Sequence, residues 1–129
     1  MMNERFFRLL FLCAALYNIA AGAVTVLFPQ LFFHQLGLPE INHPYVMSGL
    51  GMFVAVYGYG FYLVSLDPVK NYQFALLGLI GKSFGIIGWW FSTAAEMIPL
   101  SAGWTNVLND IVWIPFFIAF LRWRSKIKG

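Results

Sequence analysis

The sequence predicts an all-α polytopic membrane protein, a four-transmembrane-helix bundle with short loops, in a single domain spanning residues 1–129. Hydrophobic residues make up 60% of the chain and charged residues only 10%, whereas a soluble domain carries about 25% charged residues. So few charges cannot cover the surface of a soluble domain, and the surplus apolar area needs lipid. The apolar residues also fall into four runs of about 20 residues, which is the length of a helix that crosses a bilayer.

Prolines and charged residues mark the ends of the four runs. The first run stops at Pro29, the second at Asp67-Pro68, and the fourth at Arg122. The third run is followed by Glu96 and Pro99. The predicted spans are residues 9–28, 45–66, 74–95 and 104–121. Because the connections are short, neighbouring spans should pack antiparallel, and the longest loop, 29–44, is expected to hold a short helix in the outer interface.

The distribution of basic residues predicts the orientation. With four spans, seven Lys and Arg side chains lie on one side of the membrane, and the loops 29–44 and 96–103 on the other side carry none. Basic loops stay in the cytoplasm, so both termini are expected there. The seven residues are Arg5, Arg8, Lys70, Arg122, Arg124, Lys126 and Lys128. Since these charges flank apolar runs, the net charge of +3 indicates a lipid bilayer as partner and no nucleic acid.

Small residues at helical spacing predict how the spans pack. Lipid provides no hydrophobic drive for helix association, so close approach of backbones at small residues takes its place. The third span carries Gly78, Gly81, Gly85, Gly88 and Ser92 at steps of 3 and 4. The second carries Ser48, Gly51, Ala55 and Gly58, and the first carries Ala14, Ala15, Asn18, Ala21, Gly22 and Thr25. Packing within the chain is the main expectation, with a homo-oligomer interface as the alternative.

A set of polar residues inside the spans contains the candidates for a substrate or ion site. Lys82 lies near the middle of the third span and Asp110 nearer the outer end of the fourth. A charge at the bilayer centre costs at least about 2.5–3.5 kcal/mol, and such residues often have a function. The other candidates are Asn18, Asn106, Asn109, Tyr57 and Trp113. Lys82 and Asp110 could pair directly or through a bridge, form two separate sites, or include an uncharged lysine.

Pro115 lacks a backbone N–H and is a candidate for a kink near Asp110; a proline tolerated without consequence is the alternative. No catalytic residue, metal site or cofactor is predicted. His34 and His43 with Glu40 between them do not have a recognised metal-ligand spacing. The single cysteine, Cys13, lies in the first apolar run and is expected to be a small buried apolar residue.

Several segments resemble a group of small bacterial four-helix membrane proteins of unknown function, broadly DoxX-like. They are Leu16-Tyr17-Asn18, Leu27-Phe28-Pro29, Gly51-Met52, Val56-Tyr57-Gly58, Asp67-Pro68, Gly78-Leu79-Ile80-Gly81-Lys82 and Asn109-Asp110-Ile111-Val112-Trp113-Ile114-Pro115-Phe116. The resemblance implies a bacterial inner-membrane protein. Similar sequences are sometimes labelled alkyl hydroperoxide reductase, but that chemistry needs an accessible reactive thiolate, and Cys13 lies in an apolar span.

The predicted function is a structural or accessory membrane subunit with a buried polar cluster, either in a homo-oligomer or in a larger membrane complex. One alternative is a small-solute or ion transporter or channel that uses Lys82 and Asp110. The other is a membrane-embedded or quinone-linked redox component, because some DoxX-type proteins are linked to quinone redox enzymes. The sequence favours a protein that is not an enzyme, since no nucleophile–base motif is present.

Overall fold

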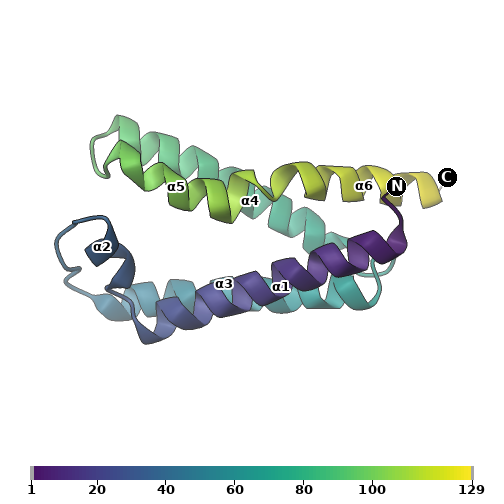
Figure 1. Ribbon diagram of the computed structural model, residues 1–129, viewed down its shortest axis with the longest axis horizontal. Helices are drawn as coiled ribbons and strands as arrows, with labels where there is room; N and C mark the ends of the chain where they lie inside the picture. The colour runs from purple at the N-terminus through teal and green to yellow at the C-terminus, as the bar shows by residue number, and fades with distance from the viewer. Residues whose placement is uncertain (1, 129) are drawn as a thin grey trace. The chain divides into compact units, whose positions relative to one another are not determined.

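The computed structural model describes residues 2–128, apart from the side chain of residue 128, and every regular element in this range is helical. In chain order the elements are α1 (Glu4–Leu27), α2 (Leu31–Gln35), α3 (Pro44–Leu66), α4 (Tyr72–Ala94), η1 (Leu100–Ala102), α5 (Gly103–Asn106), η2 (Val107–Ile111) and α6 (Ile114–Lys128). Figure 1 shows them along the chain. Helical backbone satisfies its own hydrogen bonds, as a lipid environment requires.

Four helical segments are long and apolar enough to cross a membrane, as predicted: Glu4–Leu27, Pro44–Leu66, Tyr72–Ala94 and Leu100–Ile127. The first begins about five residues earlier than expected, because Asn3 accepts a hydrogen bond from the Phe6 N–H and caps α1. The fourth is longer at both ends than the predicted 104–121. The chain divides into two compact units, one ending at Phe74 and the other beginning at Ala75, and each is described separately.

The first unit is a pair of helices, α1 and α3, that lie side by side (Figure 1). Their backbones approach so closely that a Cβ atom added to Gly22 would lie 2.6 Å from the Gly51 carbonyl oxygen. A Cβ added to Gly58 would lie 3.0 Å from the Ala15 carbonyl oxygen. The Ser48 hydroxyl donates to the Val26 carbonyl at 3.1 Å. These contacts confirm the predicted packing of the small-residue faces of the first two spans.

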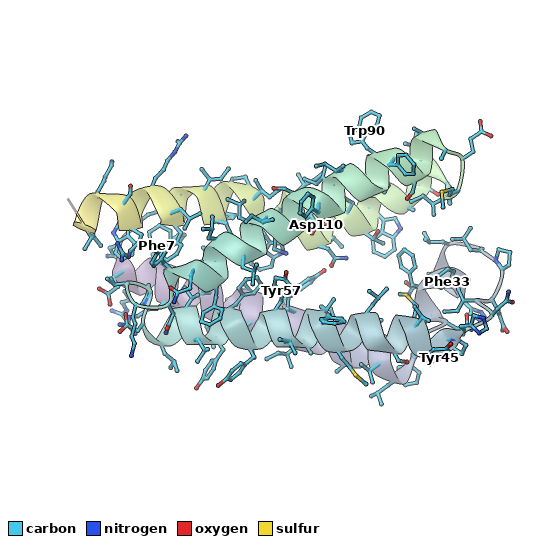
Figure 2. All side chains as sticks on the ribbon, turned by 180° about the vertical axis from the view of Figure 1, so that it is seen from behind. Phe7, Phe33, Tyr45, Tyr57, Trp90 and Asp110 are labelled. Atoms are coloured by element: carbon cyan, nitrogen blue, oxygen red, sulfur yellow. The ribbon has the colours of Figure 1, made fainter. Side chains whose placement is uncertain are left out.

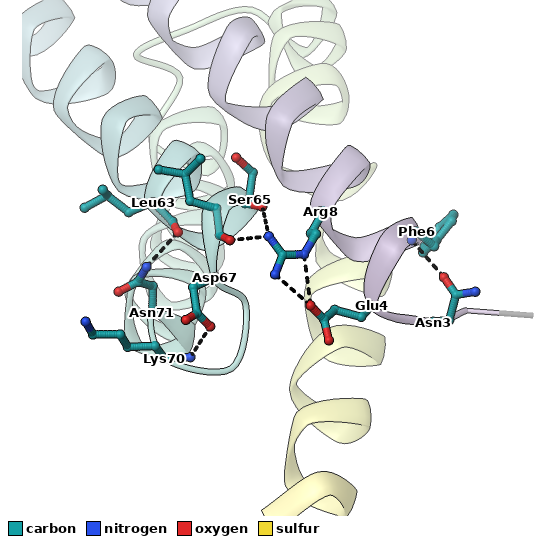
Figure 3. A network of polar contacts seen from close by, with 10 residues as sticks. Asn3, Glu4, Phe6, Arg8, Leu63, Ser65, Asp67, Lys70 and Asn71 are labelled. Carbon is teal, nitrogen blue, oxygen red and sulfur yellow. Dashed lines mark hydrogen bonds and ion pairs between the residues drawn. The ribbon is translucent and has the colours of Figure 1, made fainter.

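The same two helices are joined at their other end by Arg8, whose guanidinium donates to the backbone carbonyls of Ser65 and Leu66 at the C-terminus of α3. Glu4, one turn earlier on α1, accepts from the guanidinium at 2.7 and 2.9 Å and holds it in place (Figure 3). A cation at the C-terminus of a helix satisfies carbonyls that lack an intrahelical donor and complements the helix dipole. Arg8 therefore caps α3 from the neighbouring helix.

The loop between α1 and α3 contains the predicted short helix, α2. The Gln30 side-chain amide closes this loop, because it donates to the Ile41 carbonyl and accepts from the Ile41 N–H at 3.2 and 3.1 Å.

Cys13 differs from the expectation: it is exposed on α1. The next two residues, Ala14 and Ala15, are buried, and a helical step of about 100° per residue turns Cys13 away from their face.

Candidate functional site

The second unit contains a helix that does not remain α-helical. After one turn of α5, the chain forms the π-helical segment η2 over Val107–Ile111, where the Val112 N–H donates to the Val107 carbonyl five residues earlier, at 3.1 Å. The Trp113 N–H then donates to the Asp110 carbonyl three residues earlier, at 3.2 Å. Pro115 follows, with no N–H to donate. The fourth span is therefore irregular just before Pro115, where the sequence indicated a possible kink, and the irregularity has the form of a π-helical segment.

Two side chains donate to the backbone carbonyls inside this irregular stretch. In an α-helix the carbonyls of Leu108 and Asn109 would accept from the N–H groups of residues 112 and 113, but those groups donate elsewhere. The Leu108 carbonyl accepts from the Trp113 indole N–H at 2.9 Å. The Asn109 carbonyl accepts from the Lys82 ammonium at 2.5 Å. Side chains that bond to these carbonyls make the π-helical segment compatible with a membrane, where an unpaired carbonyl is costly.

Lys82 is buried on α4, with 8% of its surface exposed. Its ammonium lies 5.9 Å from the ring centroids of both Trp113 and Phe117. A cation within about 6 Å of an aromatic ring is attracted to the ring face. The fourth span thus holds the lysine by one backbone carbonyl and two aromatic rings.

Asp110 lies against the same helix, α4, and is labelled in Figure 2. A Cβ atom added to Gly85 would lie only 2.4 Å from the Asp110 Oδ2 atom, so the absent side chain of Gly85 leaves room for the carboxylate. The Asn106 side-chain amide, one turn before Asp110, donates to Oδ2 at 2.8 Å. Gly85 was predicted as a helix-packing residue, and the group that packs against it is this carboxylate.

Lys82 and Asp110 do not form a direct ion pair. They are close enough to interact electrostatically, but no nitrogen–oxygen distance between these two described residues falls within 4.0 Å. The ammonium binds the backbone carbonyl of Asn109, the residue that precedes Asp110, and the carboxylate binds Asn106. The sequence left open a direct pair, a bridged pair or separate sites, and the structure shows two neighbouring charges with different primary partners.

The structure brings five of the seven predicted polar candidates into this cluster, here called the Lys82–Asp110 centre. Its members are Lys82, Asn106, Asn109, Asp110 and Trp113. The other two lie in the first unit. Asn18 donates from its amide to the Val54 carbonyl at 3.5 Å, the outer limit of a hydrogen bond, and the ring of Tyr57 lies 6.4 Å from that of Phe61.

Only some glycines of the predicted stripe on the third span make close contacts. Gly78 is buried and Gly85 contacts Asp110, but a Cβ atom on Gly88 would meet no atom within 4 Å. The close contact near the C-terminal end of α4 is instead made by Trp89, whose ring atom Cζ2 would lie 2.8 Å from a Cβ on Gly103. Within the described residues Gly88 therefore makes no close packing contact, and its role as a packing residue stays a prediction. The glycine that permits close packing here lies on the fourth span, at a position that the spacing of residues on the third span could not indicate.

Sequence reasoning also missed two polar side chains, Trp89 and Thr93. Their atoms Trp89 Nε1 and Thr93 Oγ1, together with Asn106 Oδ1, are buried and have no hydrogen-bond partner among the described residues. The four-residue spacing of Trp89 and Thr93 places both on one face of α4. Since a tryptophan or threonine in a span is usually unremarkable, only the structure shows that these atoms lack partners.

The described residues contain no group of three or more His, Cys, Asp or Glu side chains that could hold a metal ion. In the loop between α1 and α3, His34 lies 3.4 Å from Glu40, and both side chains are largely exposed. The ring of His43 lies against that of Tyr45, with centroids 5.7 Å apart. The Lys82–Asp110 centre therefore consists of one ammonium, one carboxylate, side-chain amides, an indole and backbone carbonyls.

Comparison with protein-family models finds no match, and comparisons with curated proteins and with solved structures find none either. What can be said of function follows from the geometry of the chain itself.

Proposed function

We propose that this chain is a multi-pass protein of the bacterial inner membrane, with both termini in the cytoplasm, and that it binds a small polar solute or an ion at the Lys82–Asp110 centre as part of a transport pathway. The observation that carries the proposal is the loss of α-helical geometry at Val107–Ile111. This segment holds Asp110, the only acidic residue of the fourth candidate span.

The Lys82–Asp110 centre carries two energetic costs in a bilayer. A charged residue inside a bilayer costs at least about 2.5–3.5 kcal/mol, and irregular backbone is tolerated there only where other groups satisfy its carbonyls. If only helix packing were needed, small apolar residues could provide it without either cost. π-Helical turns occur often at functional sites, and interrupted helices with charged neighbours form the substrate and ion sites of many transporters.

The centre also has the right chemistry for a polar guest. Asp110 and the side-chain oxygen of Asn106 are acceptors on the fourth span, and the Asn106 oxygen has no partner among the described residues. Lys82 supplies a positive charge from α4. A cation or a neutral hydrogen-bonding solute can therefore bind to these oxygen atoms, and without a guest Lys82 balances the charge of Asp110.

A structural or accessory subunit is the second candidate, and a specific observation favours it. The Lys82 ammonium bonds to the backbone of the fourth span and lies beside two aromatic rings, as expected of a residue that fixes the register of two helices. The sequence alone ranked this role first. The interrupted helix and the unpartnered atoms beside it favour the solute or ion site.

Two features support the location. The seven basic residues that flank the spans favour cytoplasmic termini. The resemblance of the Lys82 and Asp110 segments to small bacterial DoxX-like proteins favours the bacterial inner membrane and an accessory link to other membrane proteins as an additional role.

Flux into liposomes tests the proposed function. Purified protein is reconstituted with dyes or isotopes that report H⁺, Na⁺, K⁺ and small neutral solutes, and wild type is compared with Asp110→Asn. We expect flux of at least one species that falls at least tenfold in Asp110→Asn. Glu96→Gln is the matched control, because Glu96 is an acidic residue in the loop after α4, and its flux should equal that of wild type.

Folding is checked on the same samples by far-UV circular dichroism. Folded wild-type protein that moves none of these species would refute the transport proposal and favour the accessory role. The accessory role in turn predicts that the chain copurifies with a larger membrane protein.

A further inference from the structure

The last two turns of α6 carry a concentrated positive charge. Their basic residues are Arg122, Arg124, Lys126 and Lys128. No acidic residue follows Asp110 in the chain, and among the described residues neither Arg122 nor Lys126 forms an ion pair. Arg8, by contrast, is paired with Glu4 at 2.7 Å. The positive charges of Arg122 and Lys126 are therefore available to an anionic partner.

Arg122 and Lys126, here called the basic pair, lie on one exposed face of α6. Residues four apart in a helix are neighbours on its surface, with Cβ atoms about 5–6 Å apart, and both side chains are exposed. Phe117, Phe120 and Arg124 are buried. A step of about 100° per residue places these three on the opposite face of the helix from the basic pair. Like charges at this spacing repel each other, so an anion bound between them stabilises both.

Helix length places the basic pair at the level of the lipid headgroups. The candidate span that contains it, Leu100–Ile127, has 28 residues. A helix of this length measures about 42 Å and exceeds the hydrocarbon layer of a bilayer by about 12 Å, so its charged end lies outside that layer. The ring of Trp123, between the two basic residues, packs against Phe120 with centroids 5.9 Å apart. Tryptophan is enriched at the boundary between hydrocarbon and headgroups, which agrees with this level.

The exposed face of α6 becomes apolar toward the interior of the span. Ile118 lies four residues before Arg122, on the same face, and is 38% exposed. A phospholipid has the same order of chemistry, with hydrocarbon chains followed by a phosphate. A free phosphate ion would not contact Ile118, and an acidic soluble protein would not reach it inside the bilayer. The surface therefore fits an anionic phospholipid.

We propose that the basic pair binds the phosphate of an anionic phospholipid whose acyl chain lies along Ile118. The Arg122 guanidinium can donate two parallel hydrogen bonds to the phosphate, and the Lys126 ammonium adds a second positive charge. Together they outweigh the negative end of the helix dipole, which is equivalent to about half an elementary charge. The headgroup must carry a net negative charge, because the ammonium of a zwitterionic headgroup compensates its own phosphate. This site lies outside the Lys82–Asp110 centre and does not depend on transport.

Native mass spectrometry of the purified protein in mild detergent tests the site, because it resolves individual bound lipids. The probes are dioleoylphosphatidylglycerol and dioleoylphosphatidylcholine, which share their acyl chains and phosphate but differ in net headgroup charge. Each basic side chain near an anionic lipid surface strengthens binding by about fivefold, so two strengthen it by about 25-fold. We expect the first phosphatidylglycerol molecule to bind at least tenfold more tightly than the first phosphatidylcholine molecule.

Three double variants locate the preference for phosphatidylglycerol on the chain. Arg122→Gln with Lys126→Gln should reduce it to less than twofold. Arg5→Gln with Lys70→Gln is the matched control, because it removes two positive charges from exposed residues of the first unit and should keep the preference within twofold of wild type. Arg122→Lys with Lys126→Arg keeps both charges of α6 and should retain most of the preference.

Loss of the preference in the α6 glutamine variant alone would support the site. Equal binding of the two lipids by the wild-type protein would overturn the proposal and favour an acidic partner protein at the basic pair. A preference that survives in the α6 glutamine variant, or that falls equally in both glutamine variants, would also overturn it, because this pair would then not set the preference. The first comparison uses the wild-type protein, and far-UV circular dichroism checks that each variant is helical.

Discussion

Replacing Gly51 with alanine should force α1 and α3 apart. A Cβ atom at this position would lie 2.7 Å from the Gly22 carbonyl oxygen, 2.9 Å from the Val26 backbone nitrogen and 2.9 Å from the Thr25 Cβ atom. Two of these three atoms belong to the backbone of α1, which cannot rotate away as a side chain can. The helices must therefore separate by roughly 0.5–1 Å to reach ordinary van der Waals distance, a change that a close-packed interface resists.

Two opposing contributions determine how much Gly51→Ala changes the free energy of unfolding. Overpacking a close interface costs about 1–3 kcal/mol, and the upper part of this range applies because the clash is with backbone. Alanine is a better helix former than glycine by up to about 1 kcal/mol, which offsets part of the loss. We expect Gly51→Ala to lower the free energy of unfolding by about 1–2 kcal/mol, after the offset.

Gly49→Ala is the matched control on the same helix. A Cβ atom at Gly49 would meet no atom within 4 Å, so only the helix propensity and the lower entropy of the unfolded chain apply. We expect Gly49→Ala to raise the free energy of unfolding by about 0.4–1 kcal/mol.

The assay is unfolding of the purified protein by SDS in mild detergent, followed by far-UV circular dichroism. Tryptophan fluorescence serves as an internal reference, because all the tryptophans lie at or after residue 89, in the second unit. Their local emission should differ little between the two variants at low SDS. A surface substitution typically changes the free energy of unfolding by no more than about 0.5 kcal/mol. If the free energies of unfolding of Gly51→Ala and Gly49→Ala differ by no more than that, the backbone contact at Gly51 does not limit stability.

Three further predictions concern α4 and the Lys82–Asp110 centre. Lys82→Met should lower the free energy of unfolding by about 3 kcal/mol, because it removes the positive charge that compensates the Asp110 carboxylate. Adding Asp110→Leu should restore part of this loss in the same SDS assay. Strictly additive losses would show that the two residues do not interact. Gly85→Ala should displace the Asp110 carboxylate, which lies 2.4 Å from the new Cβ, and reduce flux in the liposome assay several-fold. Gly88→Ala, whose new Cβ meets no atom within 4 Å, should have wild-type flux. Equal flux in the two variants would contradict the contact between Gly85 and Asp110. Glu96 has a positive φ of 56°, so Glu96→Gly should raise the free energy of unfolding by about 1 kcal/mol, and a loss of stability would refute strain at this turn.

Composition and small-residue spacing were enough to predict most of the first unit. The contacts of Gly22, Gly51 and Gly58 follow from steps of 3 and 4 on two apolar helices, because in lipid the close approach of backbones provides much of the packing energy. The cap that Arg8 forms on α3 was not predicted. Arg8 was assigned only as a cytoplasmic charge, since nothing in the sequence indicates which helix end a flanking arginine will reach.

The second unit was predicted less completely. The sequence identified Lys82 and Asp110 from their charge, but a direct pair was one of the options and the structure shows Lys82 on a backbone carbonyl. Pro115 indicated an irregular helix, but not its π-helical form, because the backbone carbonyls of residues 108 and 109 gain their partners from side chains that only the fold brings close. Polar atoms without partners, such as Trp89 Nε1, leave no signature in residue order.

The cap formed by Arg8 has a consequence for the biogenesis of the protein. Arg8 reaches Ser65 and Leu66, and the glycine contacts between α1 and α3 involve residues between these two ends. All of these residues precede α4 in the chain, so they are synthesised and leave the ribosome before α4 does. The partners of the first helix pair are therefore already present in the nascent chain, whereas Lys82 must wait for residue 109 before its carbonyl partner exists.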